Sequence, residues 1–248
     1  MGVVTAVSRI KADGAALPKR QPKADREAIS HNLNGQKLGR KGRVTRERIL
    51  AATVELISES GDTPISLSAV ARRAGLGMTS LYVYFSDLTE LLMAVLEPVM
   101  REAGEPGGYF NLLANYWQDE QLEESCRTFV QSYFEFWRKH SRILHLRNSL
   151  SDQYDQRMML ARIRSAQPVI ALFRKQLAES GKSTEQVGGD MASVLMTGLE
   201  RAVTIATDDV SQTMFTPELG PRQTNVVEPL SRLMFLAVRD CRQLSATT

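Results

Sequence analysis

Apolar residues recur every three or four positions over long stretches of this chain, which is the spacing of one face of an α-helix. From Tyr109 onward, no stretch alternates apolar and polar residues as a half-buried strand would. Pro98 is expected to bend one helix and Pro168 to interrupt another, because proline cannot donate to the preceding turn. The pattern predicts an all-α fold with helices over residues 45–61, 87–103, 122–140, 141–149, 152–181, 185–206 and 224–244.

Residues 66–85 have a more specific pattern, which predicts two short helices joined by a tight turn. Ser66 is the expected N-cap of the first helix, and either Gly77 or Thr79 that of the second. Gly75 follows the first helix, where a left-handed conformation costs glycine little. The positions expected to be buried are Val70, Ala71, Ala74, Leu76, Leu81 and Tyr84. This arrangement is typical of the DNA-binding helix-turn-helix, whose second helix, here residues 78–85, enters the major groove. An ordinary helical hairpin is the alternative.

The flanking segments support the same interpretation. Thr45 is expected to cap the helix that precedes the motif, and Gly61 to end it. Asp87 and Glu90 are spaced as the N-cap and N3 residues of a capping box before the next helix.

Residues 45–92 resemble the DNA-binding head of the TetR family of transcriptional regulators. The matching residues are Ile49, Ala51, Ala52, Val70, Ala71, Ala74, Gly75, Leu81, Tyr82, Phe85, Leu91 and Leu92. Two positions depart from the family pattern: Gly77-Met78-Thr79 stands where Ser-Lys-Gly is frequent, and Leu88 where a lysine commonly contacts phosphate. The resemblance implies an N-terminal three-helix head with a helix-turn-helix, followed by a larger helical ligand-binding and dimerisation domain. We therefore expect a basic, disordered arm over residues 1–43, a DNA-binding domain over 44–92, and the helical domain over 93–248.

The formal net charge of +3 is unevenly distributed. Residues 1–46 hold 11 Lys and Arg against 3 Asp and Glu, which leaves 20 basic and 25 acidic residues for the rest. A basic end beside an acidic body favours contact with a polyanion, and the adjacent motif indicates double-stranded DNA. A merely solubilising tail is the alternative for the arm.

Candidate DNA-binding residues lie in the basic segment and on the second helix of the motif, where side chains can donate to phosphate or contact base edges. Tyr82 resembles the family's phosphate-contacting tyrosine, while Tyr84 either packs in the core or contacts DNA. The full set is Lys37, Arg40, Lys41, Arg43, Thr45, Arg46, Ser66, Met78, Thr79, Ser80, Tyr82 and Tyr84.

The last two predicted helices are more apolar than a single buried stripe requires, and they carry small residues such as Ala192 and Gly198. This composition suits a four-helix interface of a two-fold homodimer, with an internal core as the alternative. A ligand pocket is expected between body helices, although aromatic and methionine side chains at such spacing more often fill a core. Arg147, on an apolar helix, either snorkels, pairs internally or holds an anionic ligand. The candidates are Trp117, Phe134, Trp137, His145, Arg147, Tyr154, Met158 and Met191.

Nothing in the sequence indicates catalysis. The three histidines lack metal-ligand spacing, there is no GxSxG serine, and Gly75-Leu76-Gly77 follows a helix rather than a strand. Cys126 and Cys241 are expected to be reduced and buried. No apolar run approaches the roughly 18 residues of a membrane span, so we expect a cytoplasmic protein without metal or cofactor.

Together these observations predict a homodimeric repressor that a small lipophilic or amphipathic effector releases from a palindromic operator. The alternatives are an activator or ligand-independent regulator of the same fold, and a helical enzyme with a vestigial head.

Overall fold

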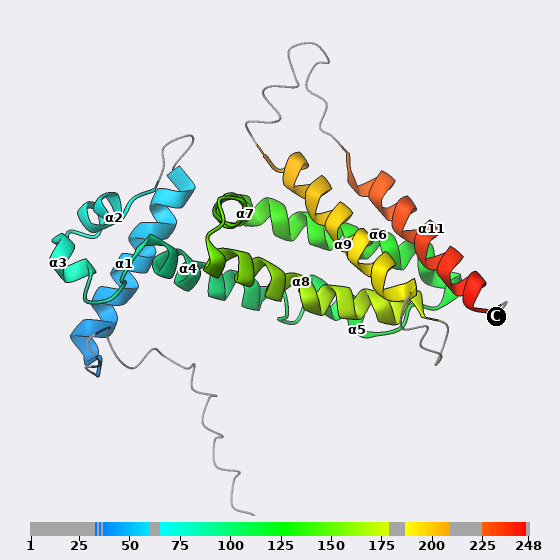
Figure 1. The fold of residues 1–248 in the computed structure, drawn as a ribbon, viewed down its shortest axis with the longest axis horizontal. Helices are drawn as coiled ribbons and strands as arrows, with labels where there is room; N and C mark the ends of the chain where they lie inside the picture. The colour runs from blue at the N-terminus through cyan, green and yellow to red at the C-terminus, as the bar shows by residue number, and fades with distance from the viewer. Residues whose placement is uncertain are drawn as a thin grey trace, which may run out of the picture.

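The structure is a computed structural model, and it describes residues 33, 35, 37–59, 65–178, 187–208 and 225–246, with no side-chain description for 187–189 and 244–246. The described residues form helices and no β-strand, which confirms the all-α prediction. A small helical head occupies one end of an elongated molecule and a larger helical body the other (Figure 1).

The head consists of α1 (Arg40–Glu59), α2 (Leu67–Arg73) and α3 (Met78–Leu81), closed by the first turn of α4 (Leu88–Glu102). Apolar side chains from all four helices and from the turn after α3 meet in one small core. The fully enclosed members include Ile49, Val70, Leu81, Phe85 and Leu91. This core fixes the angle between α2 and α3 and therefore the direction in which α3 faces solvent.

Helix capping in the head follows the sequence closely. The Ser66 hydroxyl accepts a hydrogen bond from the Ala69 amide at 3.3 Å, as expected of an N-cap. The Asp87 carboxylate accepts from the Glu90 amide at 2.9 Å and begins α4. The return bond of the capping box is displaced by one residue, because the Glu90 carboxylate accepts from the Ser86 amide at 2.7 Å.

The bounds of two head helices differ from the prediction. α1 begins at Arg40 rather than Thr45, and the Thr45 hydroxyl donates to the Lys41 carbonyl within the helix instead of capping it. Leu38 is buried and lies against the first turn of α1 beside Gly42, so burial of this apolar side chain stabilises a start that has no cap in the sequence. α3 ends at Leu81, four residues before the predicted end at residue 85. The turn that follows directs Phe85 into the core.

The body contains α5 (Tyr109–Ala114), a 3-10 turn at Asp119–Gln121, α6 (Leu122–Lys139), α7 (Ser141–Asp152), α8 (Gln156–Leu177), α9 (Val187–Ala206) and α11 (Val227–Ala246). Pro168 does not interrupt α8, contrary to expectation. Pro168 is exposed, so the backbone carbonyl one turn earlier, which lacks a helical partner because proline has no N–H, can bond to water.

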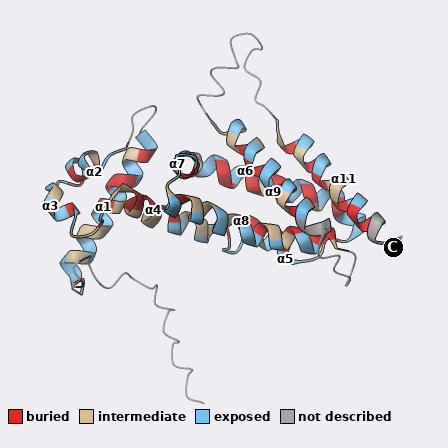
Figure 2. Cartoon of the chain, viewed as in Figure 1, coloured by how far each residue is buried: buried red, intermediate tan, exposed pale blue. Residues whose placement is uncertain are grey.

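Aromatic side chains from α5, α6 and α8 form the centre of the body core, which Figure 2 shows as the buried inner faces of these helices. Tyr109 packs edge-on against Tyr133, with ring centroids 4.9 Å apart, and Phe129 packs edge-on against Phe173 at 5.3 Å. Such pairs stabilise a core beyond the area that they bury. α9 and α11 pack side by side across the part of the body remote from the head (Figure 1).

The turn between α2 and α3 gives a sharp test of the fold. Gly75 has φ of +63°, where an alanine would be strained, whereas Gly77 has φ of −74°, which any residue adopts. Neither glycine has a neighbour within 4 Å of an added Cβ, so conformation alone separates them. We expect Gly75→Ala to lower the free energy of unfolding by about 1 kcal/mol and Gly77→Ala to change it by less than about 0.5 kcal/mol. Equal effects in urea unfolding would contradict this account of the turn.

Candidate nucleic-acid interface

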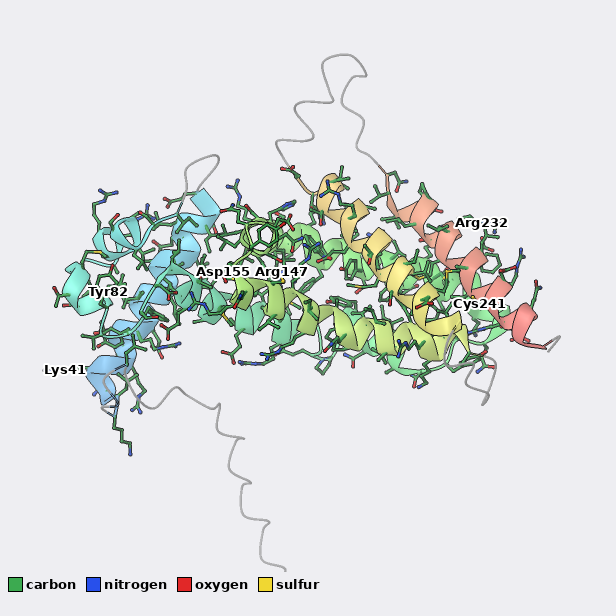
Figure 3. The ribbon with its side chains drawn as sticks, viewed as in Figure 1. Lys41, Tyr82, Arg147, Asp155, Arg232 and Cys241 are labelled. Atoms are coloured by element: carbon green, nitrogen blue, oxygen red, sulfur yellow. The ribbon has the colours of Figure 1, made fainter. Side chains whose placement is uncertain are left out.

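The exposed surface of α3 and the turn after it is rich in hydrogen-bonding side chains. Leu81 is fully buried and holds this short helix to the head, so Thr79 and Ser80 face solvent. Tyr82 is 49% exposed, and Figure 3 shows it at the end of the molecule remote from the body. Hydroxyl groups so placed can donate to phosphate or accept from base edges.

Two candidates on this helix also take part in the head core. Met78 and Tyr84 are partly buried and pack against the cluster around Leu81. The Tyr84 ring therefore packs in the head core, which is one of the two roles predicted for it.

The described residues that precede α1 are held to the head, and Leu33 contacts the turn after α3. The Leu33 amide donates to the Val83 carbonyl at 3.1 Å, and Leu38 is 5% exposed. Residues 40–43, expected in a disordered arm, form the first turn of α1. Four cationic side chains in this region are exposed: Lys37, Arg40, Lys41 and Arg43. Lys41 lies at the same end of the molecule as Tyr82 (Figure 3), so this region combines positive charge with polar readout groups.

Two other candidates in the head, Arg46 and Ser66, have partners within the protein, and so does Arg73, which was not among the candidates. The Arg46 guanidinium lies over the Phe85 ring, 5.2 Å from its centroid, and burial lowers its pKa. The Ser66 hydroxyl caps α2. Arg73 forms a bidentate ion pair with Glu59, at 2.5 and 2.9 Å, on the α1 side of the head. These contacts stabilise the head and leave the exposed segment and α3 as its most available surface.

A polar joint connects the helix-turn-helix to the body. Arg157, in the first turn of α8, donates to both carboxylate oxygens of Asp87, at 2.9 and 3.0 Å. The Thr89 hydroxyl donates to Asp155, the N-cap of α8, at 2.6 Å. The Arg157 bonds hold the pKa of Asp87 below its usual value, and the Thr89 bond does the same for Asp155. We call these four residues the α4–α8 joint. The position of Asp155 just before a helix is a local sequence signal for an N-cap. Its bond to Thr89, 66 residues away, has no such signal.

The predicted ligand-binding residues do not converge on one open pocket. Trp117, Trp137 and Met158 are buried in the core, and Phe134 packs against it. Met191 lines a separate groove between α9 and α11. Tyr154 is 82% exposed, in a left-handed turn with φ of 65°, so its assignment to a pocket is wrong. The turn between α7 and α8 directs it outward.

Arg147 is paired internally, which was one of the three predicted alternatives. It is 3% exposed and donates to Glu200 at 2.7 Å, to Asn148 at 2.9 and 3.0 Å, and to Ser165 at 3.2 Å. Its guanidinium also lies 5.7 Å from the centre of the Trp137 ring, and His145 packs edge-on against the same ring at 6.1 Å. Burial lowers the pKa of Arg147, and the Glu200 carboxylate opposes that shift.

The space around this pair is nearly filled. Arg147, Glu200, Tyr109 and Trp137 enclose a cavity of about 10 Å³. A cavity of that size holds at most about one water molecule. A larger ligand would have to displace these side chains.

The described residues show no metal-binding or membrane-spanning feature. They contain no group of three or more His, Cys, Asp or Glu arranged to hold a metal ion, and no helix among them is long and apolar enough to cross a bilayer. Cys126 and Cys241 are buried and unbridged, and burial raises the pKa of the Cys126 thiol to about 12. Cys126 is therefore a packing residue.

The geometry of the head defines the class of protein: a helix-turn-helix DNA-binding protein. Comparison with known proteins narrows this class. Residues 49–95 match the family of bacterial regulatory proteins described as the tetR family. The uncharacterised HTH-type transcriptional regulator YvdT of Bacillus subtilis (strain 168) is 37% identical over 54 residues, which cover 22% of this chain and 28% of YvdT. The chain thus carries the DNA-binding region of the TetR family of transcriptional regulators, and the resemblance of residues 45–92 is confirmed.

Solved structures extend the likeness of fold to the body. The fatty acid degradation regulator FadR of Bacillus halodurans aligns over 81% of this chain and 97% of its own, with a TM-score of 0.55 and 17% identity. A protein of Mesorhizobium loti MAFF303099 assigned to the TetR family aligns over 84% and 98%, with a TM-score of 0.50 and 20% identity. At this identity the comparison establishes the helical fold alone.

The buried ion pair between Arg147 and Glu200 should contribute measurably to the stability of the body. Arg147→Ala should lower the free energy of unfolding by about 3 kcal/mol, because it removes a satisfied buried cation and leaves Glu200 with one partner fewer. Arg164→Ala, at an exposed position of the neighbouring helix α8, should change it by less than about 0.5 kcal/mol. Thermal or urea unfolding measures both. A small effect of Arg147→Ala would show that the guanidinium contributes little to the body.

Proposed function

We propose that this chain is a homodimeric repressor that binds a palindromic operator and is released from it by a small lipophilic or amphipathic effector. The observation that carries the proposal is the exposed α3 surface, together with four exposed cationic side chains in and just before the first turn of α1, in a TetR-type head. Cationic side chains beside a recognition helix add affinity by binding phosphates, and the side chains of the helix give sequence specificity by contacting bases.

The α9–α11 surface supports self-association. Val194 and Leu233 are 65% and 55% exposed, and Leu236 is 38% exposed. They line an apolar groove of about 480 Å³ between the two helices. Exposed contiguous apolar surface of this kind marks interaction sites, and two such helix pairs can form a four-helix interface. A dimer would present two α3 helices to successive major grooves, about 34 Å apart, which requires a two-fold symmetric operator.

Release by an effector requires that the ligand bind one conformation of the body better than the other. The α4–α8 joint provides a direct mechanical connection, because α8 contributes to the body core while its first turn holds the start of α4. A ligand that moved α8 would therefore shift the head. The nearly filled cavity at Arg147 favours a second candidate, a ligand-independent regulator of the same fold. Neither reading assigns a catalytic role to any residue.

DNA binding can be tested directly by selecting a bound sequence from random duplexes and then measuring affinity against salt. We expect Arg40→Ala and Lys41→Ala each to weaken binding to all duplexes by a similar factor and to reduce the salt slope by about 1. Tyr82→Ala should weaken binding as well, whereas Arg164→Ala in the body should leave it unchanged. If the wild-type protein showed no preference among duplexes, the proposal would fail.

Self-association can be tested with one pair of exposed leucines. Leu233→Glu places a charge on the proposed interface, and Leu160→Glu places one on an equally exposed site of α8, at 55% and 49% exposure. Sedimentation should show that Leu233→Glu weakens the dimer at least about 100-fold, as expected when a charge is buried without a partner, and that Leu160→Glu leaves it intact. A dimer unaffected by Leu233→Glu would place the interface elsewhere.

A further inference from the structure

A groove of about 450 Å³ separates the head from the body on the side where α1 approaches α7. We call it the head–body groove. Its walls come from α1, from α4, and from residues 138–143 at the corner between α6 and α7. None of the residues proposed above for DNA contact or for self-association lines this groove.

The floor of the groove is apolar. Val54 and Ile57 of α1 and Val95 and Val99 of α4 line it. Val54 is 48% exposed, so part of this surface meets water in the described structure. Covering such a surface with an apolar group is favourable in proportion to the area removed from water.

The rim of the groove is cationic. Residues 138–142 read Arg-Lys-His-Ser-Arg, and none of the described residues that line the groove is acidic. Glu102, just outside it, accepts from Lys139 at 2.6 Å and lies 3.1 Å from His140, which compensates that part of the rim. Arg138 is exposed and forms no ion pair with any residue that the structure describes. The rim therefore presents at least one cation that the described residues do not neutralise.

Two helix ends meet at this corner. α7 begins at Ser141, with His140 as its N-cap, and α6 ends at Lys139, with the same His140 as its C-cap. The partial positive charge at the start of one helix and the partial negative charge at the end of the other offset each other, so the positive potential of the rim comes from its side chains.

From this combination we infer that the head–body groove binds a small amphipathic anion, with a carboxylate or phosphate group at the rim and an apolar tail on the floor. The volume lies within the range of sites for small organic ligands. Because α1 belongs to the head and α7 to the body, a ligand in the groove contacts both and favours the arrangement that keeps the groove at its width. An effect on DNA affinity would rest on the proposed function, whereas ligand binding itself would not.

The test is calorimetric titration of the full chain with octanoate, which is monomeric at the concentrations needed. Octyl phosphate, 1-octanol and inorganic phosphate complete the set, so that the contributions of head group and tail are separated. We expect octanoate or octyl phosphate to bind at least about tenfold more tightly than 1-octanol or phosphate alone, as an added charged hydrogen bond or an added buried tail would give. Tighter binding of one of the two anions would identify the preferred head group.

Matched variants locate the site. Val54→Asp places a carboxylate on the floor, and Val44→Asp places one at a similarly exposed position ten residues earlier on the same helix, at 48% and 56% exposure. Arg138→Ala removes the cation at the rim, and Arg164→Ala removes an exposed arginine of α8. Val54→Asp and Arg138→Ala should each weaken octanoate binding about tenfold, and the two controls less than about twofold. Circular dichroism confirms that each variant is folded.

Three results would overturn the inference: no binding of either anion, equal affinity for octanoate and 1-octanol, or affinities that Val54→Asp and Arg138→Ala leave unchanged. These titrations contain no DNA. If no ligand binds in the groove, the proposal of operator binding is unaffected. If the protein does not bind an operator, the proposal of a ligand in the groove is likewise unaffected.

Discussion

The structure depends on α4, a single helix that contributes to two hydrophobic cores. Leu91 is fully buried in the core of the head, while Leu92, Val95 and Leu96 are buried in the core of the body. Each core excludes water only if α4 keeps its position in both. The orientation of α3 relative to the body is therefore set by packing on two sides of one helix, and any shift of α4 in the body must appear as a movement of the head.

Two sets of polar contacts supplement this packing, one largely exposed and one buried. The α4–α8 joint is largely exposed, so solvent screens its ion pair and its contribution is mainly geometric. The Arg147–Glu200 pair lies deep between α7 and α9, and Arg162 of α8 donates to the second carboxylate oxygen of Glu200 at 3.2 and 3.3 Å. A buried pair of this kind gains little over apolar packing but is costly to break, so it fixes the relative register of three helices. Contacts therefore run from the α9–α11 surface through α8 to the start of α4.

The head combines a rigid core with an unusually short α3. Four residues of helix would not be stable alone, and the burial of Leu81 and Phe85 supplies the stability that length does not. The left-handed Gly75 sets the turn that precedes it. α1 begins early enough to include Arg40, Lys41 and Arg43, and the bond from Leu33 to Val83 ties the chain before it to the turn after α3. The result is a small surface whose backbone is fixed by the head core, with exposed polar and cationic side chains projecting from it.

The sequence by itself determined the helical class, the helix-turn-helix, the caps at Ser66 and Asp87, and most helix positions in the body, because these depend on local spacing and on hydrogen bonds between near neighbours. It gave no sign that α1 begins at Arg40, since burial of Leu38 decides that start. It also left the role of Arg147 open, because its partner Glu200 is 53 residues away. The filled interior, the outward turn of Tyr154 and the contact of Arg157 with Asp87 are likewise products of tertiary structure. Pairings over such distances arise when helices pack against one another, and hydrophobic periodicity specifies which face of a helix is buried but not which partner it meets.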